Sequence, residues 1–215
     1  MSDSMPDSAV ARQSMVDSQL SARGISDTRV LAAMLRVPRH QFVPESQRAQ
    51  AYEDHPLPIG DGQTISQPYV VALMLESLQL APTDKVLEVG TGSGYVTVLL
   101  AEIAAQVFSI ERQPALADSA RSVLAALGYA NIQLFTGDGT LGLPAIAPFD
   151  AILVSAAAPA VPSALLTQLR EGGRMIIPIG HSDNQQLQFI RMINGVPVVQ
   201  PRELVRFVPL IPDHN

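Results

Sequence analysis

The sequence predicts an α/β protein with a doubly wound, mostly parallel sheet, antiparallel C-terminal strands and an N-terminal helical extension. Between residues 85 and 179, short β-branched runs alternate with helical segments, which is typical of parallel strands joined by helical crossovers. The first run leads into three glycines spaced two apart, at residues 90–94, directly before a helical segment. A turn-forming Asn-Gly pair between later strand-like segments indicates antiparallel pairing at the end of the sheet.

Composition favours one large domain and excludes several kinds of chemistry. With 215 residues, 47% of them hydrophobic and 16% charged, the chain has enough apolar side chains for a substantial core. The net charge of -6 gives no basic face for nucleic acid or an anionic membrane, so neither is expected as a partner. The absence of cysteine excludes disulfides, thiolate zinc sites and cysteine nucleophiles.

No segment has the features of a targeting or membrane-spanning sequence. Residues 1–10 are polar and lack the apolar core of a secretory signal. The longest uncharged stretch, residues 151–169, is interrupted by Pro159 and Pro162. We therefore expect a cytoplasmic protein, and we take a monomer as the default.

Two helices are expected before residue 38. Residues 10–23 place their apolar side chains near one face, and Gly24 is expected to end that helix. Asp27 is a suitable N-cap for a second helix over residues 28–37, which Pro38 stops.

Residues 38–69 show no periodicity and are rich in proline and glycine. A connection this long without secondary structure is unusual inside a compact domain, and it therefore indicates a functional segment. Ser66 is a suitable cap for a helix that runs to about Leu80, with Pro68 in its first turn.

From residue 85 onward, strands and helices alternate. Pro114 at the start of one helix and Gly128 just past its end occupy the positions that these residues prefer. The predicted strands are 85–89, 106–110, 132–136, 149–154 and 174–179, and the predicted helices are 94–104, 114–127 and 162–170. Residues 186–193 and 196–199 are then expected to form a hairpin around Asn194-Gly195, with 204–209 as a closing strand.

The spacing of the glycine loop distinguishes between cofactors. Dinucleotide-binding loops have the pattern G-x-G-x-x-G, in which the third glycine lets the helix pack closely on the strand. Here the order is Gly90-Thr91-Gly92-Ser93-Gly94, preceded by Glu88. This spacing favours a cofactor with one nucleoside and a short polar tail over a pyrophosphate.

Three acidic residues lie at the ends of three successive predicted strands. Glu111 is placed to accept hydrogen bonds from the ribose hydroxyls of a nucleoside. Asp138 is placed to accept one from an exocyclic amine such as that of adenine. Together with Glu88 they are expected along the carboxyl edge of the sheet, where open α/β sheets bind ligands. Such an acidic rim suits the positive sulfonium of S-adenosylmethionine better than an anionic dinucleotide. The alternative interpretation is that these acids are solvated and cap the following helices.

Other residue types do not form recognisable catalytic motifs. The histidines are scattered without metal-ligand spacing, so no metal is expected; they are His40, His55, His181 and His214. Ser93 lacks the flanking glycines of a hydrolase G-x-S-x-G motif. Lys85, the only lysine, is not preceded by the phosphate-binding pattern of a P-loop.

Seven segments in this order resemble one enzyme family. They are Gln63-Thr64-Ile65-Ser66-Gln67-Pro68, residues 86–95, Ile110-Glu111-Arg112, Gly137-Asp138-Gly139, Ala156-Ala157-Ala158-Pro159, Gly172-Gly173-Arg174 and residues 205–210. They resemble the protein-L-isoaspartate O-methyltransferases from about Met15 to Leu210. The glycine motif is common to many methyltransferases, whereas the Thr-Ile-Ser segment is much more specific. The departures are modest: Ser155 stands where threonine is frequent, and residues 181–184 replace a more glycine-rich loop.

The resemblance implies a Rossmann-like class I S-adenosylmethionine-dependent methyltransferase. Such an enzyme transfers a methyl group to the free α-carboxylate of L-isoaspartyl residues in damaged proteins and peptides, which starts their repair. It further implies that Ser66 is the catalytic residue and that Thr64, Ile65 and Ser66 contact the substrate. The cofactor-binding residues that it implies are Glu88, Gly90, Thr91, Gly92, Ser93, Gly94, Glu111, Arg112, Asp138 and Gly139. We therefore divide the single domain into a helical and substrate-loop region, 1–80, and a methyltransferase core, 81–215.

Three alternative functions stay open at this point. The first is a methyltransferase of the same fold that acts on another carboxylate, a small molecule or RNA, although the acidic charge balance disfavours RNA. The second is a module that binds isoaspartyl sites without turnover. An NAD-dependent oxidoreductase is the weakest alternative because of the glycine spacing.

Overall fold

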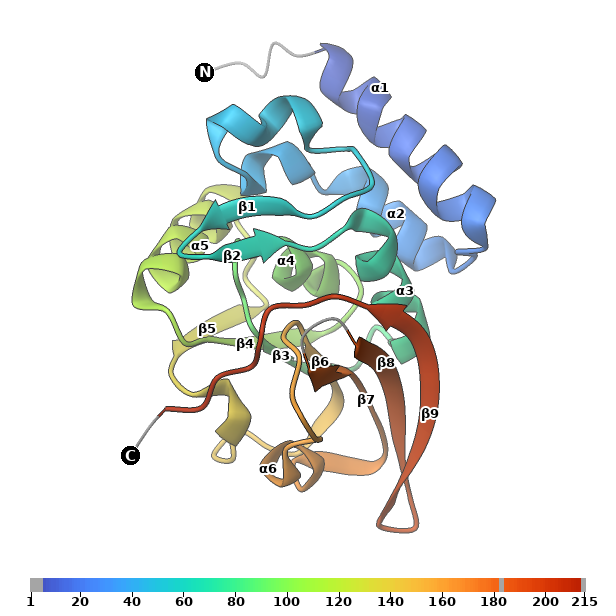
Figure 1. Cartoon of the computed structure of the whole chain (residues 1–215), viewed down its shortest axis with the longest axis vertical. Coiled ribbons are helices and arrows are strands. Elements are labelled where there is room, and N and C mark those ends of the chain that lie inside the picture. The colour runs from blue at the N-terminus through green and yellow to red at the C-terminus, as the bar shows by residue number, and fades with distance from the viewer. Residues whose placement is uncertain (1–5, 182–183, 214–215) are drawn as a thin grey trace.

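A seven-stranded sheet forms the centre of the computed structural model, which describes residues 6–181 and 184–213 (Figure 1). The strand order is β5-β4-β3-β6-β7-β8-β9. Neighbouring strands from β5 to β7 are parallel, whereas β8 and β9 pair antiparallel at one edge. The strands are β3 (Lys85–Val89), β4 (Gln106–Glu111), β5 (Ile132–Thr136), β6 (Phe149–Val154), β7 (Leu169–His181), β8 (Asn184–Ile193) and β9 (Val196–Val205). The sheet confirms the predicted α/β class and its antiparallel C-terminal strands.

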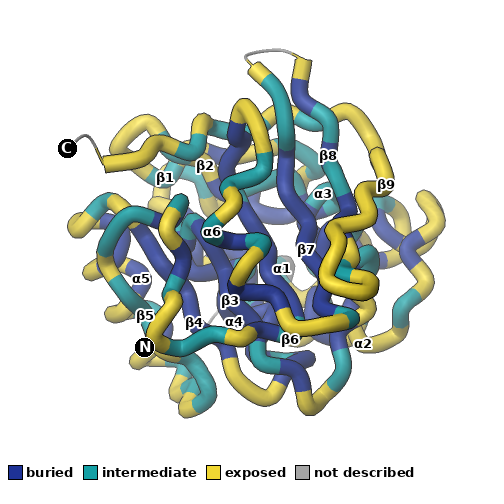
Figure 2. The backbone as a smooth tube through the Cα atoms, turned by 90° about the horizontal axis from the view of Figure 1, so that it is seen from below, coloured by how far each residue is buried: buried dark blue, intermediate teal, exposed yellow. Residues whose placement is uncertain are grey.

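Apolar clusters cover the two faces of this sheet. Val86 belongs to a cluster that also contains buried residues of the helices α3 (Pro68–Leu78), α4 (Tyr95–Ala101) and α5 (Pro114–Leu127). Its neighbour Leu87 belongs to the opposite cluster, together with Leu165 of the short helix α6 (Ser163–Leu166). Successive strand residues point to opposite faces, and both faces are buried at the central strands β3, β4 and β6, whereas β9 is exposed along nearly its whole length (Figure 2).

Both predicted N-terminal helices form, although the first begins at Pro6, before the expected residue 10. Helix α1 (Pro6–Ser14) continues through a π-helical segment, Met15–Leu20, and a 3₁₀ turn, Ser21–Arg23, before Gly24 ends it with a φ of 96°. Helix α2 (Thr28–Arg36) follows, and the Asp27 carboxylate accepts a hydrogen bond from the Arg29 N–H at 2.9 Å. Asp27 is therefore the expected N-cap.

The segment before α3 contains more regular structure than expected. Two 3₁₀ turns, Arg39–Phe42 and Glu45–Gln50, are followed by a hairpin of β1 (Leu57–Gly60) and β2 (Gln63–Ile65). The expectation of an irregular stretch is wrong for residues 57–65, which form this hairpin. The strands are short and the first is interrupted by proline, so the sequence shows no clear alternation of apolar and polar side chains. Gly60, Asp61 and Gly62 all have positive φ, which lets the chain reverse within a few residues.

Ser66 is not the N-cap of α3, which corrects a second expectation. The helix begins at Pro68, and its N-cap residue Gln67 provides no side-chain cap. The carboxylate of Asp54 instead accepts a hydrogen bond from the Tyr69 N–H at 3.2 Å. A residue 15 positions away thus binds a free N–H group at the start of this helix.

Several boundaries in the second half of the chain also differ from the prediction. The expected strand at 204–209 is not separate, because β9 continues to Val205 and Pro209 forms only an isolated bridge with Ala157. Helices α4 and α6 are shorter than expected. Strand β7 starts earlier because Leu169 pairs with Phe149. Within the described residues, no helix is long and apolar enough to cross a membrane.

Candidate active site

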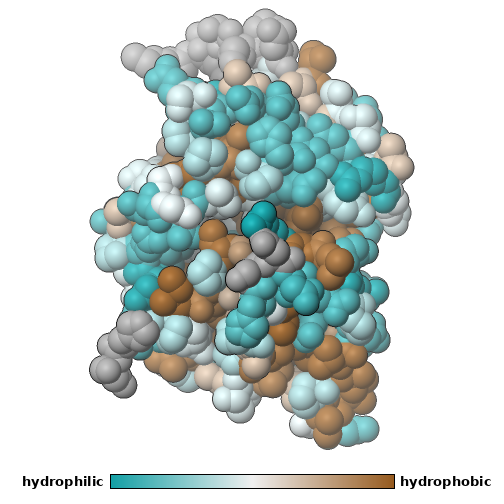
Figure 3. All heavy atoms as spheres, viewed as in Figure 1, coloured by the Kyte–Doolittle hydropathy of each residue, from teal (hydrophilic) through white to brown (hydrophobic). Residues whose placement is uncertain are grey.

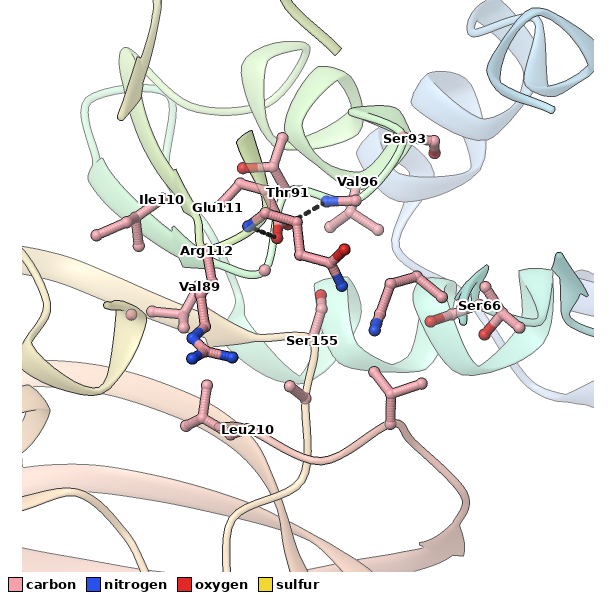
Figure 4. Close-up of a pocket in the computed structure, with 18 of the residues that line it drawn as sticks. Ser66, Val89, Thr91, Ser93, Val96, Ile110, Glu111, Arg112, Ser155 and Leu210 are labelled. Carbon is pink, nitrogen blue, oxygen red and sulfur yellow. Dashed lines mark hydrogen bonds between the residues drawn. The ribbon is translucent and has the colours of Figure 1, made fainter. Parts of the chain in front are cut away.

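A pocket lies at the carboxyl ends of β3, β4 and β6, the edge at which open α/β sheets bind ligands. The glycine loop forms one wall, and the end of β2 with Ser66 forms another. The chain after β9 closes a third side. Figure 4 shows Ser66 and Ile110 at opposite ends of the pocket. The residues that line it are Gln63–Ser66, Val89–Ser93, Tyr95, Val96, Ile110–Gln113, Gly139, Ser155, Ala156 and 208–211.

Two glycines that line the pocket pack closely against neighbouring side chains. A Cβ on Gly139 would lie 2.5 Å from Cγ1 of Val89, a distance at which the two atoms overlap. A Cβ on Gly92, whose φ is 53°, would touch Ile59 of β1 at 3.4 Å. Glycine at position 139 is therefore required by the packing against Val89, and glycine at position 92 is favoured by its positive φ.

The carboxylate of Glu111 joins the glycine loop to helix α5. One oxygen accepts a hydrogen bond from the Gly92 N–H at 2.9 Å, and the other accepts one from the Gln113 N–H at 2.9 Å. Glu111 ends β4 and is buried, yet it lines the pocket.

Glu88 lies below the glycine loop and does not line the pocket. Its side chain is fully buried and accepts hydrogen bonds from the hydroxyls of Thr97 and Ser109. Burial raises the pKa of Glu88 to about 8, although these two hydrogen bonds favour the charged form. The Ser109 hydroxyl is also 2.6 Å from that of Thr91 in the loop. Glu88 therefore supports the loop from below, which removes it from the set of direct cofactor contacts.

Asp138 and Arg112 are both joined to the C-terminal segment. Arg112 lines the pocket, and its Nε donates to the Asp213 carboxylate at 2.8 Å. Asp138 lies beside the lining residue Gly139; one of its oxygens accepts from Thr140 and the other from the Asp213 N–H at 3.0 Å. Burial opposes ionisation of Asp138, but the bonds from Thr140 and Asp213 and the charge of Arg112 lower its pKa.

The wall opposite the glycine loop is built by Thr64, Ile65 and Ser66, which the sequence predicted as the substrate segment. No group within residues 6–181 and 184–213 forms a hydrogen bond with the Ser66 hydroxyl. That hydroxyl has one proton to donate. The structure thus brings the predicted substrate and cofactor segments to the same pocket.

Helix α3, which follows Ser66, is held by charged residues at both ends. Asp54 binds the Gln67 side chain at 2.8 Å and the Tyr69 N–H at its start, and Arg23 forms an ion pair with Asp54. At the other end, Arg174 of β7 donates to the carbonyl oxygens of Leu78 and Gln79 at 2.9 and 3.2 Å. An anion at the N-terminus and a cation at the C-terminus both stabilise the helix dipole. Arg174 lies within the Gly172-Gly173-Arg174 segment, but no sequence pattern joins it or Asp54 to Ser66.

Some residues of the pocket wall are not among the site residues predicted from the sequence. Gln63, Gln113 and Ser155 line the pocket, as do residues 208–211 after the last strand. The apolar run Val208-Pro209-Leu210 is equally compatible with a closing strand. Its bridge to Ala157 is what places it beside the pocket. Within the part of the chain that the structure describes, no group of three or more potential metal ligands occurs. His214 lies outside that part.

The fold and the pocket together define an α/β enzyme of the class I methyltransferase type, with a glycine loop after the first parallel strand and an acid at the end of the second. The model of the protein-L-isoaspartate(D-aspartate) O-methyltransferase family matches residues 11–215. The chain belongs to this family.

Individual relatives agree with this family. The chain is 55% identical over 208 residues to a protein-L-isoaspartate O-methyltransferase of Roseiflexus sp. (strain RS-1), covering 97% of this chain and 95% of the relative. A solved structure described as such an enzyme from Plasmodium falciparum, in complex with S-adenosyl-L-homocysteine, has 30% identity and a TM-score of 0.83. The match covers 94% of this chain and 99% of that structure's chain. A second solved protein-L-isoaspartate O-methyltransferase has 31% identity and a TM-score of 0.84 over 92% of this chain, which spans 65% of that longer chain.

Proposed function

We propose that this enzyme transfers the methyl group of S-adenosylmethionine to the free α-carboxylate of L-isoaspartyl residues in damaged proteins and peptides, which starts their repair. One observation carries the proposal: the glycine loop with Glu111 and the Thr64–Ser66 segment line one pocket from two sides. Membership of the family supports the same reaction and the same class of substrate.

The residues present fit this methyl donor. Gly90, Thr91, Gly92 and Ser93 line the pocket and would hold its methionine part, whereas Gly94 lies outside the lining, where it is the N-cap residue of α4. Glu111 and Arg112 would lie at the ribose side, and Gly139, which lines the same pocket, would lie at the adenine side. When bound, S-adenosylmethionine supplies an electrophilic methyl group on a positive sulfonium. Asp138 would accept from the adenine amine once the Asp213 N–H releases it.

The substrate carboxylate that accepts the methyl group has to be oriented, but it needs no general base. A carboxylate with a pKa of roughly 3 to 4 is already ionised at neutral pH, so no proton has to be removed. The Ser66 hydroxyl would donate to one carboxylate oxygen and leave the other directed at the methyl group. Thr64 and Ile65 would shape the slot and exclude water, which raises the reactivity of the oxygen.

A labelling experiment tests this function. Radiolabelled S-adenosylmethionine is offered with paired peptides that differ only in Asp or isoAsp. We expect base-labile label on the isoAsp peptide alone. Equal label on both peptides would indicate a different carboxylate acceptor. Binding of the isoAsp peptide without label would indicate a module that recognises the site but does not turn over. The cytoplasmic location and the monomeric state stay predictions.

A further inference from the structure

The turn between β8 and β9 consists of Asn194 and Gly195, which have φ angles of 53° and 73°. Tight hairpin turns in which both central residues have positive φ favour Asn-Gly over all other pairs. Both residues are exposed, and no atom lies within 4 Å of the position of a Cβ on Gly195. The apolar surface at the lower right of Figure 3 lies where Figure 1 places this hairpin turn. The fold thus favours, at an exposed position, a dipeptide that is chemically short-lived.

Asn-Gly pairs convert spontaneously to isoaspartyl residues. The Gly195 nitrogen attacks Cγ of Asn194, a C–N bond forms, and the Cγ–Nδ2 bond breaks. Ammonia leaves with the proton of the former Gly195 N–H, and a succinimide remains. Water then opens this ring: addition at the α-carbonyl gives isoaspartate, and addition at the β-carbonyl gives aspartate. Asn194 is the only asparagine of the chain that precedes a glycine.

The attacking nitrogen is held by a carboxylate from the neighbouring strand. Glu171 of β7 accepts a hydrogen bond from the Asn194 N–H at 2.7 Å with one oxygen. Its other oxygen accepts one from the Gly195 N–H at 3.0 Å. A carboxylate that accepts two backbone N–H groups forms stronger hydrogen bonds than a neutral acceptor does.

We propose that Asn194 is a modification site of this protein and that Glu171 protects it from conversion to isoaspartate. Two physical effects act in the same direction. The two hydrogen bonds fix the turn, so the Gly195 nitrogen cannot swing toward Cγ of Asn194 without breaking one of them. The attack also places negative charge on that nitrogen as its proton leaves, and the adjacent carboxylate repels that charge.

Protection of Asn194 would also affect how the enzyme acts on its own copies, an inference that rests on the proposed function. An isoaspartyl residue at position 194 would belong to the class of substrate that the enzyme itself methylates. The residue lies on the β8–β9 hairpin, outside the pocket lining, so one copy would have to act on another. Glu171 would then reduce the rate at which the enzyme becomes its own substrate.

Ageing of purified variants tests the protection without any methyl transfer. Wild type, Glu171→Gln and Glu171→Ala are incubated without a methyl donor at mildly alkaline pH, and deamidation at Asn194 is followed by peptide mass spectrometry. We expect Glu171→Ala to deamidate about fivefold faster than wild type or more, because it loses two charge-assisted hydrogen bonds in an exposed turn. Glu171→Gln keeps one acceptor oxygen but no charge and should fall between the two.

Matched controls separate this local effect from general loosening of the fold. Glu203→Ala removes another exposed acid, on β9, and should leave the rate at Asn194 unchanged. Asn131, whose side chain binds the carbonyl oxygens of Ala101 and Ala104, should stay intact in all variants. Equal rates at Asn194 in wild type and Glu171→Ala, or no deamidation in either, would overturn the proposal.

A second experiment tests the self-substrate relationship alone. Aged Glu171→Ala protein is offered to fresh wild-type enzyme with labelled methyl donor, beside an isoAsp peptide. Label on the peptide that contains residue 194 supports the relationship. Label on the isoAsp peptide but not on isoaspartyl-194 refutes it and leaves both the protection and the proposed function standing. If neither acceptor is labelled, the proposed function itself is wrong.

Discussion

The carboxylate of Glu111 accepts a hydrogen bond from the Gly92 N–H at 2.9 Å, so one side chain joins the end of β4 to the middle of the glycine loop. Its second oxygen accepts from Gln113 at the start of α5. A residue that the sequence marked as a ribose contact thus also fixes the shape of the loop. Cofactor affinity and loop order should consequently depend on the same carboxylate.

Glu111→Ala should weaken binding of S-adenosylhomocysteine by about 10-fold to 100-fold, because a charged acceptor is lost at a buried position. Titration calorimetry measures this directly. Asp118→Asn, which removes an exposed carboxylate on α5, serves as the matched control and should bind normally. Unchanged affinity of Glu111→Ala would show that the carboxylate does not contact the cofactor.

Ser66→Ala should lower kcat/KM for an isoAsp peptide by about 10-fold or more, since a hydrogen bond to a charged group disappears. Affinity for S-adenosylhomocysteine should stay within a few-fold of wild type. Steady-state kinetics and calorimetry on the same preparation separate the two effects. If cofactor binding collapses while peptide binding survives, the assignment of Ser66 to the substrate side is wrong.

Asp54→Ala should disturb the start of α3 and with it the position of Ser66. The loss of a capping interaction of about 1 kcal/mol predicts a Tm lower by about 2 to 4 °C. The KM for peptide should rise while affinity for the cofactor product is retained, because Asp54 binds Gln67 and Tyr69 and not the glycine loop. Arg36→Ala breaks another surface ion pair away from α3 and is the control. A rise in KM of the same size in that control would count against a specific role.

Glu88 should make the stability of the protein depend on pH. Its pKa is about 8 in the folded state, against 4.5 for an exposed glutamate, so the folded state retains the proton. The stabilisation is fully present below about pH 4.5 and is lost as the pH rises toward 8. Glu88→Gln mimics the protonated acid, so its Tm should exceed that of wild type at pH 8.5 by about 3 °C or more. Thermal melts between pH 5 and 8.5 should show this gap closing toward the acid side, and a gap independent of pH would contradict the assignment.

Asp213 occupies two groups that the cofactor is proposed to use, Arg112 and Asp138. Asp213→Ala removes the carboxylate that holds Arg112 and should strengthen binding of S-adenosylhomocysteine by up to about fivefold, the range of an exposed ion pair. The gain should shrink at high salt, where such pairs are screened. Weaker binding by the variant would show that the C-terminal segment contacts the cofactor and does not compete with it.

The sequence predicted the parts of the fold that depend on local pattern. Asp27 as an N-cap, Gly24 as a helix end and the strand boundaries at 85–89, 132–136 and 149–154 all match the structure. The β1–β2 hairpin was missed because strands of four and three residues carry too few side chains to show alternation. The anchoring of α3 by Asp54 and Arg174 was missed because both contacts join distant parts of the chain.

The residues of the candidate site also divide into those that a local sequence pattern predicts and those that depend on how the chain packs. Glu111, Gly139 and Ser66 were assigned from strand ends and motif, and all of them line the pocket. Glu88 stands at a strand end too, but alternation along β3 turns its side chain to the face covered by α4, where Thr97 binds it. Sequence spacing gives the end of a strand, whereas the face on which a side chain lies depends on register.

The position of residues 208–211 in the pocket wall has a consequence for synthesis of the protein. These residues follow all seven strands of the sheet in the chain. A chain that emerges N-terminus first can assemble its sheet and glycine loop before this wall exists. A ligand stabilises only the state that binds it. A ligand that needs this wall therefore stabilises the finished fold and not a partly made chain, for which the apolar clusters on the two faces of the sheet supply the driving force.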